Sequence, residues 1–600
     1  MTGAEHIAEF LARVGSEHVY ALTGGACAFM IDAVERRSEL TLTCFHHEQC
    51  AAMAADAVWR ASGKVGVTMA TSGPGATNLI TGIACSYFDS IPSLHITGQV
   101  NQREGSGFHG ANVRQSGFQE MKIVDMVRPI TKYAVMVKSP EELRHELAKA
   151  YSIAVSGRKG PVLVDVPIDI QQMKVEGDVI LPEMSQVNAD PLDLVAAAVT
   201  DTLSRARRPI VLWGAGVGLA GVARSVSAWL SATKIPFVSS WGGLTYFDNS
   251  QPEFLGQIGV YGNRGANFAL QNADTVLVLG SRLDNRQRSG NPGNFATGAN
   301  VHVVDVDEEE LRKYGGDGYR TSLLDFKFLP TILKNTRLPK LDDTWLAYTA
   351  EMKERYFGRE YSTSAQRLNT LSPYAVIRRI NELIKDNAIV AADTGATVCW
   401  VHQAFKVKQH TLFTAGGNSP MGYALPAAIG AKIAAPDRQV VAFSGDGGFH
   451  LNIHELQTLK HHDLPVAIIV MNNMSYGIIK QFQDSYCGSR YTGSRDGFSL
   501  PDFGQVAQAY GIRYARIENV DQLTGELFKE AGPIVIDIML SEHTLIEPKL
   551  EVGRPINDQY PYLSSEEYAS GNRFVDYPRS AEFLRVLDDS DFGRDRNNRA

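Results

Sequence analysis

Short apolar segments rich in β-branched residues alternate along the chain with longer segments in which apolar residues recur at helical spacing. Many of the short segments end at Gly, Pro, Asp or Asn, as in VGVTMAT, SLHITGQ, GPVLVDVP, PIVLWGAG, TVLVLGS, VHVVDVD, VVAFSGDG, VAIIVMNN and PIVIDIML. Strands that are buried on both faces have continuous apolar sequences, and parallel strands are joined by helical crossovers. The pattern therefore predicts an α/β protein built from parallel sheets.

The alternation is interrupted twice, by a polar, acidic stretch at about 172–190 and by a charged stretch at about 338–372. These breaks predict three domains, at 1–172, 190–340 and 365–545. The first and third share a pattern of strand, glycine-rich turn and helix, in TMATSGPGATNLITG and AFSGDGGFHLNIHEL, which indicates that they are related. Residues 546–600 are rich in Pro, Tyr and charge, and we expect them to form a wrapping arm or a tail.

Composition excludes several classes of protein. The 58 basic and 66 acidic side chains give a formal charge of −8, and no dense Lys/Arg block is present, so neither nucleic acid nor an anionic membrane is an expected partner. The six cysteines show neither CxxC pairs nor Cys/His metal spacing, which predicts free thiols. No uninterrupted apolar run approaches about 18 residues. We therefore expect a cytoplasmic protein.

Two strand ends carry the most informative chemistry. Gly445, Asp446 and Gly447 close one predicted strand, and Asn472 and Asn473 close the next, with Asn473 27 positions after Asp446. A helical crossover between parallel strands places both ends in one crevice. A carboxylate and an amide oxygen there suit Mg²⁺ or Ca²⁺, and glycines allow backbone N–H groups to approach phosphate oxygens. The pair predicts a metal-bridged diphosphate.

This pair of motifs resembles the GDG…NN signature of enzymes that depend on thiamine diphosphate (ThDP). The resemblance implies that Asp446, Asn473 and the backbone carbonyl of Ser475 hold Mg²⁺. It implies further cofactor contacts in the same two loops, from Gly445, Gly447, Gly448, Tyr476, Gly477 and Ile478.

The same resemblance assigns roles in the first domain. Glu48, in TCFHHEQCAAMAADA, matches the glutamate that protonates the cofactor's pyrimidine ring, and the turn from Ser72 to Asn78 matches the loop that binds this ring. In the family, this domain forms the active site together with the third domain of a second subunit. We therefore expect Gly25 and Glu48 of one chain to close over Asp446, Asn473 and Met421 of its partner, in a homodimer or homotetramer.

In the third domain, GGNSPMGYALPAAIGA matches the helix that supports ThDP. Met421 corresponds to the bulky side chain that bends the cofactor, and the Ser419 carbonyl to the acceptor of its 4′-amino group. Gly395 and Thr397, in the loop DTGAT, would cap the diphosphate. This loop departs from the family, because Ala396 and Thr397 stand where Gln and His are usual, so the resemblance implies an altered contact there.

The middle domain resembles an FAD-binding domain, from the order of PIVLWGAGVGLAG, GQIGVYGNRGANFAL, VLVLGSRLDNRQRSG and VHVVDVDEEEL. The resemblance implies FAD as a second cofactor, which we expect to be structural. For the arginines, surface ion pairing is the alternative interpretation. The matching flavin contacts are Arg158, Gly214, Ala215, Gly216, Gly262, Arg282, Arg286 and Asp305.

Over residues 3–545 the chain is similar to the acetolactate synthase group of ThDP enzymes. Its three domains follow the same order as in that group. Three departures lie where a second substrate is expected to enter. The loop NQREGSGFHGANVRQSG is longer than usual, Ile168 replaces a Lys, and Phe482 replaces a Trp. The donor half of the site matches the group, whereas the acceptor half is remodelled.

The resemblance implies an enzyme that decarboxylates pyruvate to a hydroxyethyl-ThDP carbanion and adds it to a second carbonyl compound. Phe118 and Gln119 would border this acceptor, Arg286 would bind its carboxylate, and Ile478, Ile479 and Phe482 would form an apolar wall. The acceptor stays open between a second pyruvate and a larger ketone, such as a nucleotide-linked keto-sugar. A pyruvate oxidase-type flavoenzyme is a further alternative, and a regulatory small subunit a further partner.

Overall fold

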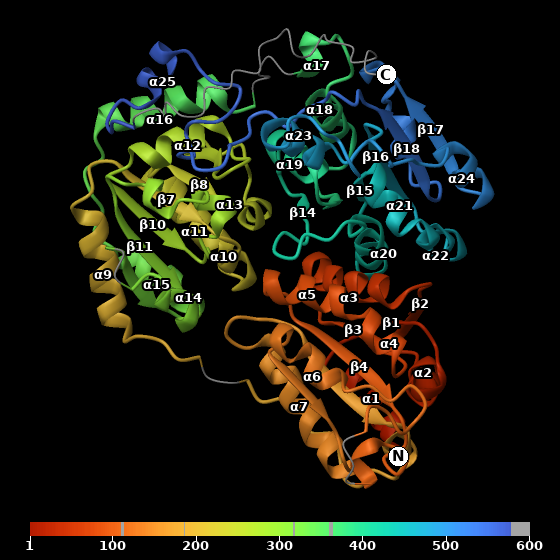
Figure 1. The fold of residues 1–600 in the computed structure, drawn as a ribbon. Helices are drawn as coiled ribbons and strands as arrows, with labels where there is room; N and C mark the ends of the chain where they lie inside the picture. Colours follow the sequence, from red (N-terminus) through yellow and green to blue (C-terminus); the bar gives the residue numbers. More distant parts are fainter. Residues whose placement is uncertain (110–112, 185–186, 316–317, 359–363, 578–600) are drawn as a thin grey trace.

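The computed structural model describes the chain except residues 110–112, 185–186, 316–317, 359–363 and 578–600. It contains three six-stranded sheets in which all strands are parallel, each covered by helices (Figure 1). The residues of the inner strands are almost all buried, as expected for sheets packed on both faces, whereas four of the edge strands are mostly partly exposed. The predicted α/β class and the three parallel-sheet domains are confirmed.

The N-terminal and C-terminal sheets have the same topology. Their orders are β2-β1-β3-β4-β6-β5 and β14-β13-β15-β16-β18-β17, so equivalent strands occupy equivalent places. The N-terminal strands are β1 His18–Ala21, β2 Thr41–Cys44, β3 Gly66–Ala70, β4 Ser93–Gln99, β5 Tyr133–Met136 and β6 Val162–Pro167. The C-terminal strands are β13 Ile389–Ala392, β14 Thr411–Phe413, β15 Val440–Gly445, β16 Val466–Asn472, β17 Arg513–Ile517 and β18 Ile534–Met539.

The middle sheet has a different order, β12-β11-β10-β7-β8-β9, in which the chain winds outward in both directions from the central pair β7 and β10. This is the strand order of dinucleotide-binding folds. Its strands are β7 Pro209–Trp213, β8 Phe237–Ser239, β9 Phe254–Gln257, β10 Thr275–Leu279, β11 Asn300–Asp305 and β12 Arg320–Leu323.

Helices surround each sheet. The N-terminal domain has α1 Gly3–Arg13, α2 Ala28–Glu35, α3 Glu48–Ser62, α4 Pro74–Asn78, α5 Ile80–Asp89, α6 Ile123–Val127, α7 Pro140–Val155 and α8 Ile168–Gln172. The middle domain has α9 Leu192–Ser204, α10 Ala215–Leu219, α11 Ala223–Thr233, α12 Arg264–Asn272, α13 Asn285–Arg288, α14 Glu308–Arg312, α15 Leu329–Asn335 and α16 Asp343–Tyr356. The C-terminal domain has α17 Ser364–Arg367, α18 Pro373–Leu383, α19 Ala396–Ala404, α20 Ala424–Ala434, α21 Asp446–Leu451, α22 Leu456–His461, α23 Gly477–Tyr486 and α24 Phe503–Ala509.

The N-terminal and C-terminal domains meet through α3 and α20, which lie against each other in Figure 1. The contact is close because its residues are small: a Cβ atom at Gly430 would lie 2.3 Å from the Ala54 carbonyl oxygen. A buried hydrogen bond also joins the two domains, because the Tyr423 hydroxyl donates to Asp56 over 2.5 Å. The alanine-rich sequence of α3 is thus explained by helix packing between domains.

The segment after β18 returns to the middle domain and packs on it, ending in α25 Ser565–Gly571 beside α16 (Figure 1). Leu550, Ile556 and Tyr568 join the hydrophobic core of that domain. The buried Arg264 on α12 donates to the carbonyl oxygens of Gln559 and Pro561. The described part of the predicted arm, up to residue 577, is therefore an ordered layer on the middle domain.

Among the described residues, none of the helices combines the length and the apolar character that a membrane crossing requires.

Candidate active site

The predicted diphosphate loops lie together at the topological switch point of the C-terminal sheet. β13 and β15 are neighbours there, but the chain leaves them in opposite directions, toward β14 and β16. The crevice outside the carboxyl ends of such strands is where open α/β sheets bind ligands. Gly395 follows β13, Asp446 follows β15 and Asn473 follows β16. The fold thus brings three distant motifs to one edge.

The residues expected to hold Mg²⁺ are buried and fit a cation. Asp446, Asn473 and Ser475 are each at most 4% exposed. The Asp446 carboxylate accepts from the backbone N–H of Gly447 at 2.6 Å and of Asn473 at 3.1 Å, which fixes its orientation. Burial raises its pKa to about 7. Among the described residues, the nitrogen of the Asn473 side-chain amide has no hydrogen-bond partner. A buried carboxylate beside a side-chain amide oxygen is a donor set suited to a hard cation.

The two glycines that follow this carboxylate leave no room for a side chain. A Cβ atom at Gly447 would lie 2.2 Å from the ring of Tyr476 and 3.3 Å from the Met421 methyl group, and one at Gly448 would lie 2.3 Å from the Asp393 carboxylate. Gly445 faces the Thr397 hydroxyl, which would lie 3.3 Å from a Cβ atom at that position. A Cβ atom at Gly477 would lie 2.5 Å from the Asn473 side-chain nitrogen, and one at Gly395 would be in ordinary contact with Ile478 at 3.8 Å. These predicted cofactor residues therefore form one cradle.

Asp393 organises the other side of the cradle. Its buried carboxylate accepts from the backbone N–H of Gly422 at 3.0 Å and from the Ser444 hydroxyl at 2.8 Å. Burial raises its pKa to about 6. These bonds connect the end of β13 to the turn that carries Met421 and to the end of β15. Ser419 has a left-handed backbone, with φ of 54°, and its hydroxyl is hydrogen-bonded to Thr394.

The predicted catalytic residues of the N-terminal domain lie at the corresponding switch point, between β1 and β3. Glu48 begins α3, is 5% exposed, and accepts a hydrogen bond of 2.9 Å from the Asn78 side chain. Ser72 is buried in the loop after β3. Gly25 is exposed in the loop after β1, where a Cβ atom would meet none of the residues that the structure describes within 4 Å. The structure brings Glu48 and Asn78 together, and places Glu48 and Asp446 in different domains.

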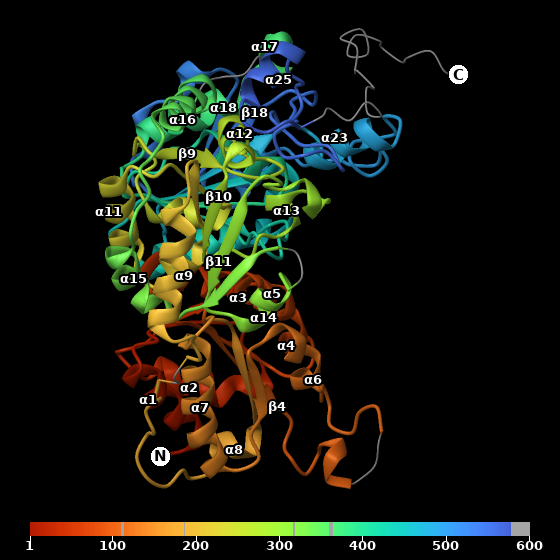
Figure 2. The same cartoon turned by 90° about the vertical axis from the view of Figure 1, so that its left-hand side faces the viewer.

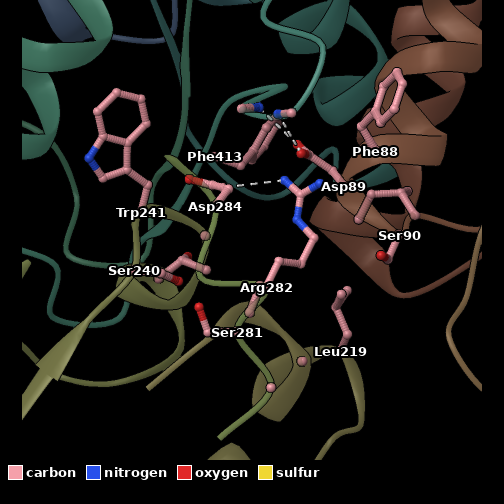
Figure 3. Close-up of a pocket in the computed structure, with 18 of the residues that line it drawn as sticks. Phe88, Asp89, Ser90, Leu219, Ser240, Trp241, Ser281, Arg282, Asp284 and Phe413 are labelled. Atoms are coloured by element: carbon pink, nitrogen blue, oxygen red, sulfur yellow. Dashed lines mark hydrogen bonds and ion pairs between the residues drawn. The ribbon is translucent and has the colours of Figure 1, made fainter. Parts of the chain in front are cut away.

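A cavity of about 840 Å³ lies between the three domains. Its walls come from the middle-domain switch point, where β7 and β10 end, and from residues of the other two domains (Figure 3). The lining includes Ser240, Trp241, Ser281, Arg282 and Asp89, and it reaches Thr394, Gly395, Ser419 and Ile478 in the C-terminal domain. The cavity thus connects the middle domain to the cradle.

Six of the predicted flavin residues line this cavity, namely Arg158, Ala215, Gly216, Arg282, Arg286 and Asp305. Gly214 and Gly262 are not among its lining residues, and both pack against backbone, since a Cβ atom at Gly214 would lie 2.0 Å from the Gly280 carbonyl oxygen. Arg158 forms ion pairs with Asp307 and Glu310, and Arg282 lies 3.6 Å from Asp284. Burial raises the pKa of Asp305 to about 6.

The predicted acceptor residues are dispersed over all three domains of the single chain, and Arg286 belongs to α13 of the middle domain. Ile479 and Phe482 lie on one exposed face of α23, 49% and 46% exposed. Phe118 is 86% exposed, and Gln119 packs beside Gly73 with a positive φ of 60°. Ile168 begins α8 and is half-buried. The described parts of the long loop after β4 stand away from the sheet (Figure 2), and residues 110–112 of that loop lie outside the described residues.

Three further residues at this site belong to no recognisable sequence motif. Asp89, at the end of α5, accepts from the backbone N–H of Gly416 and Gly417 and so connects the N-terminal domain to the cradle. Trp241 and His402 stack at 5.2 Å between the middle and C-terminal domains. The sequence carries no signal for any of the three, because each contacts residues that are distant along the chain.

Comparison with known proteins identifies the class. Residues 1–126 match the N-terminal TPP binding domain of thiamine pyrophosphate enzymes, residues 196–317 match their central domain, and residues 393–538 match their C-terminal TPP binding domain. Thiamine pyrophosphate is another name for ThDP. The fold and the two switch-point loops are therefore those of a ThDP-dependent enzyme.

The relatives define the group more narrowly. The acetolactate synthase large subunit of Lactococcus lactis is 32% identical, over 92% of this chain and 95% of the relative. The large subunit of acetolactate synthase isozyme 2 from Escherichia coli is 32% identical, over 94% of this chain and the full length of the relative. A probable acetolactate synthase large subunit of Methanocaldococcus jannaschii is 33% identical, over 90% of this chain and 92% of the relative. The chain belongs to the acetolactate synthase large-subunit family of ThDP enzymes.

Proposed function

We propose that this enzyme decarboxylates pyruvate and joins the resulting two-carbon unit to the carbonyl group of a second 2-oxo acid. The observation that carries the proposal is the buried cradle of Asp446, Asn473 and their glycine loops at one switch point, matched by Glu48 at the equivalent point of the N-terminal domain. Relatives named acetolactate synthase, each aligned over most of its length, support this reaction. They do not favour the keto-sugar or the oxidase alternative.

When bound, ThDP supplies an electron sink that stabilises the carbanion left by decarboxylation. The chain's own residues bind and orient the cofactor and move protons. Asp446, Asn473 and the Ser475 carbonyl would hold Mg²⁺ against the diphosphate, and Met421 would support the cofactor beside Gly447. Glu48 is held by Asn78 and would exchange a proton with the pyrimidine ring. The buried surroundings of the cradle exclude water from the reacting atoms.

The proposal includes FAD as a second, structural cofactor. The cavity at the β7/β10 switch point fits a dinucleotide, because the strand order there and its volume of about 840 Å³ suit one, and two of its four arginines, Arg282 and Arg286, suit a diphosphate. Trp241 lines this cavity, which extends to the cradle. This assignment is independent of the carboligation itself, which needs no flavin redox step.

Replacing Arg282 and Arg286 together tests the flavin assignment. We expect Arg282→Ala with Arg286→Ala to weaken FAD binding at least about 10-fold, because each charge-assisted hydrogen bond contributes about 1.5–3 kcal/mol. Flavin fluorescence titration of the apoenzyme measures this change. The control is Arg320→Ala, which removes an exposed ion pair with Asp201 elsewhere on the same domain. An enzyme that binds no FAD, or a double variant that binds it as tightly as the wild type, contradicts the assignment.

Product analysis tests the reaction. The enzyme is incubated with ThDP, Mg²⁺, FAD and ¹³C-labelled pyruvate, and products are identified by mass spectrometry. We expect labelled CO₂ and labelled acetolactate to form together throughout catalytic turnover. Labelled CO₂ with acetaldehyde and only traces of acetolactate would show that decarboxylation occurs but that pyruvate is not the acceptor. The absence of labelled CO₂ would refute pyruvate as the donor.

We also propose that the active enzyme is a homodimer or homotetramer, in which Glu48 of one chain faces Asp446 of another. The apolar face of α23 supports this assembly, because Ile479 and Phe482 are exposed in the single chain beside the cradle. The relatives are named large subunits, which supports a regulatory small subunit as a further partner.

A further inference from the structure

Three metal-binding side chains meet where the N-terminal and C-terminal domains pack together, outside the cradle described above. Cys50 lies in the first turn of α3, and His454 and Glu455 form the end of a short 3₁₀ helix, η7 Ile453–Glu455, between α21 and α22. The Cys50 sulfur lies 3.7 Å from His454 Nε2, and this nitrogen lies 3.4 Å from Glu455 Oε1. All three ligand atoms lie within 4.8 Å of one another.

These distances agree with the geometry of zinc. A tetrahedral Zn²⁺, with Zn–S of about 2.3 Å and Zn–N and Zn–O of about 2.0–2.2 Å, separates its sulfur and nitrogen ligands by about 3.6 Å and its nitrogen and oxygen ligands by about 3.4 Å. The observed separations of 3.7 and 3.4 Å match these two values, and the Cys50 and Glu455 ligand atoms lie within 4.8 Å of each other. One thiolate, one imidazole and one carboxylate also form the mixed donor set that zinc accepts and Mg²⁺ does not.

The surroundings hold the ligands in place. Cys50 and Glu455 are fully buried, whereas the His454 side chain is 36% exposed and offers a path for an ion. Glu455 is oriented by two donors, the backbone N–H of His46 at 3.1 Å and the Thr458 hydroxyl at 2.5 Å. Such outer hydrogen bonds orient the ligands of metal sites in proteins. The His47 ring lies 6.1 Å from that of His454, centroid to centroid, on the exposed side.

We propose that Cys50, His454 and Glu455 bind one Zn²⁺ ion that fastens the start of α3 to the C-terminal domain. Binding replaces the thiol proton of Cys50, which is released to solvent, by a sulfur–zinc bond. The ion would fix the helix turn that also carries Glu48, two residues before Cys50. The sequence shows no metal spacing here, because Cys50 and His454 are 404 positions apart and only the domain contact unites them.

Zinc binding is measured on the full enzyme after removal of metal and with excess Mg²⁺ present, which occupies the Asp446 site. We expect one equivalent of Zn²⁺ per chain, and with Co²⁺ as the probe we expect a cobalt–thiolate charge-transfer absorption. Both signals should be lost in Cys50→Ser and in His454→Gln, the second of which changes a partly exposed side chain and should fold normally. Cys85→Ser, at another buried cysteine of the same domain contact, is the matched control and should retain both.

The hydrogen bond from Thr458 to Glu455 provides a second test, with a smaller expected effect. Thr458→Val removes the donor to Glu455 Oε2 and should weaken zinc binding by about 10–100-fold without abolishing it. Asp446→Ala should leave zinc binding unchanged, which separates this site from the diphosphate site. A wild-type enzyme that retains no more zinc than Cys50→Ser, or whose cobalt complex lacks thiolate absorption, overturns the proposal.

Discussion

Glu48→Gln is expected to lower kcat by about 10²–10⁴-fold, the range that a positioned proton-transfer group contributes. Glutamine is nearly isosteric and can still bond to Asn78, so the local structure should persist while proton exchange with the pyrimidine ring fails. Steady-state kinetics with pyruvate give kcat. Isothermal titration with ThDP and Mg²⁺ should show cofactor affinity close to that of the wild type.

A suitable control is Glu142→Gln. Glu142 also lies in the first turn of a helix, α7, and accepts a backbone hydrogen bond, but it belongs to the surface far from the cradle. Its replacement removes the same charge and should leave kcat unchanged. If Glu48→Gln keeps wild-type turnover, Glu48 has no part in the chemistry.

Asp446→Ala is expected to abolish activity through loss of the cofactor. The variant removes the buried carboxylate and leaves the Asn473 side chain as the remaining side-chain ligand. The affinity for Mg²⁺ with ThDP should fall more than about 100-fold, because even the outer partners of metal ligands contribute about 10–100-fold. ThDP retained after gel filtration in the presence of Mg²⁺ is the measurement.

Asp537→Asn separates this effect from general damage to the sheet. Asp537 is buried in β18 of the same domain, where it accepts from Asn472 and Tyr514. Its replacement should reduce thermal stability but leave ThDP retention intact. Full retention of ThDP by a folded Asp446→Ala variant would contradict the assigned metal site.

The local part of the site could be predicted from the sequence. The GDG and NN motifs follow apolar strands directly, and parallel strands joined by a helix end at one edge of their sheet. Asp446 and Asn473 could therefore be placed together from strand pattern and spacing alone. Residues that act across domain boundaries could not be placed in this way. Asp89 binds the Gly416 and Gly417 backbone, and Trp241 stacks on His402, through contacts that leave no periodic signal.

The parallel α/β architecture, the three domains and the chemistry of the cradle are encoded in short segments of the sequence, because strand burial, turn residues and metal ligands are local properties. The strand order of the middle sheet and the cavity that connects it to the cradle emerge only in the folded chain. The same holds for the cover that residues after β18 form on the middle domain and for the contact of Cys50 with His454. These features arise from packing between segments hundreds of residues apart, and packing depends on complementary shape rather than on local pattern.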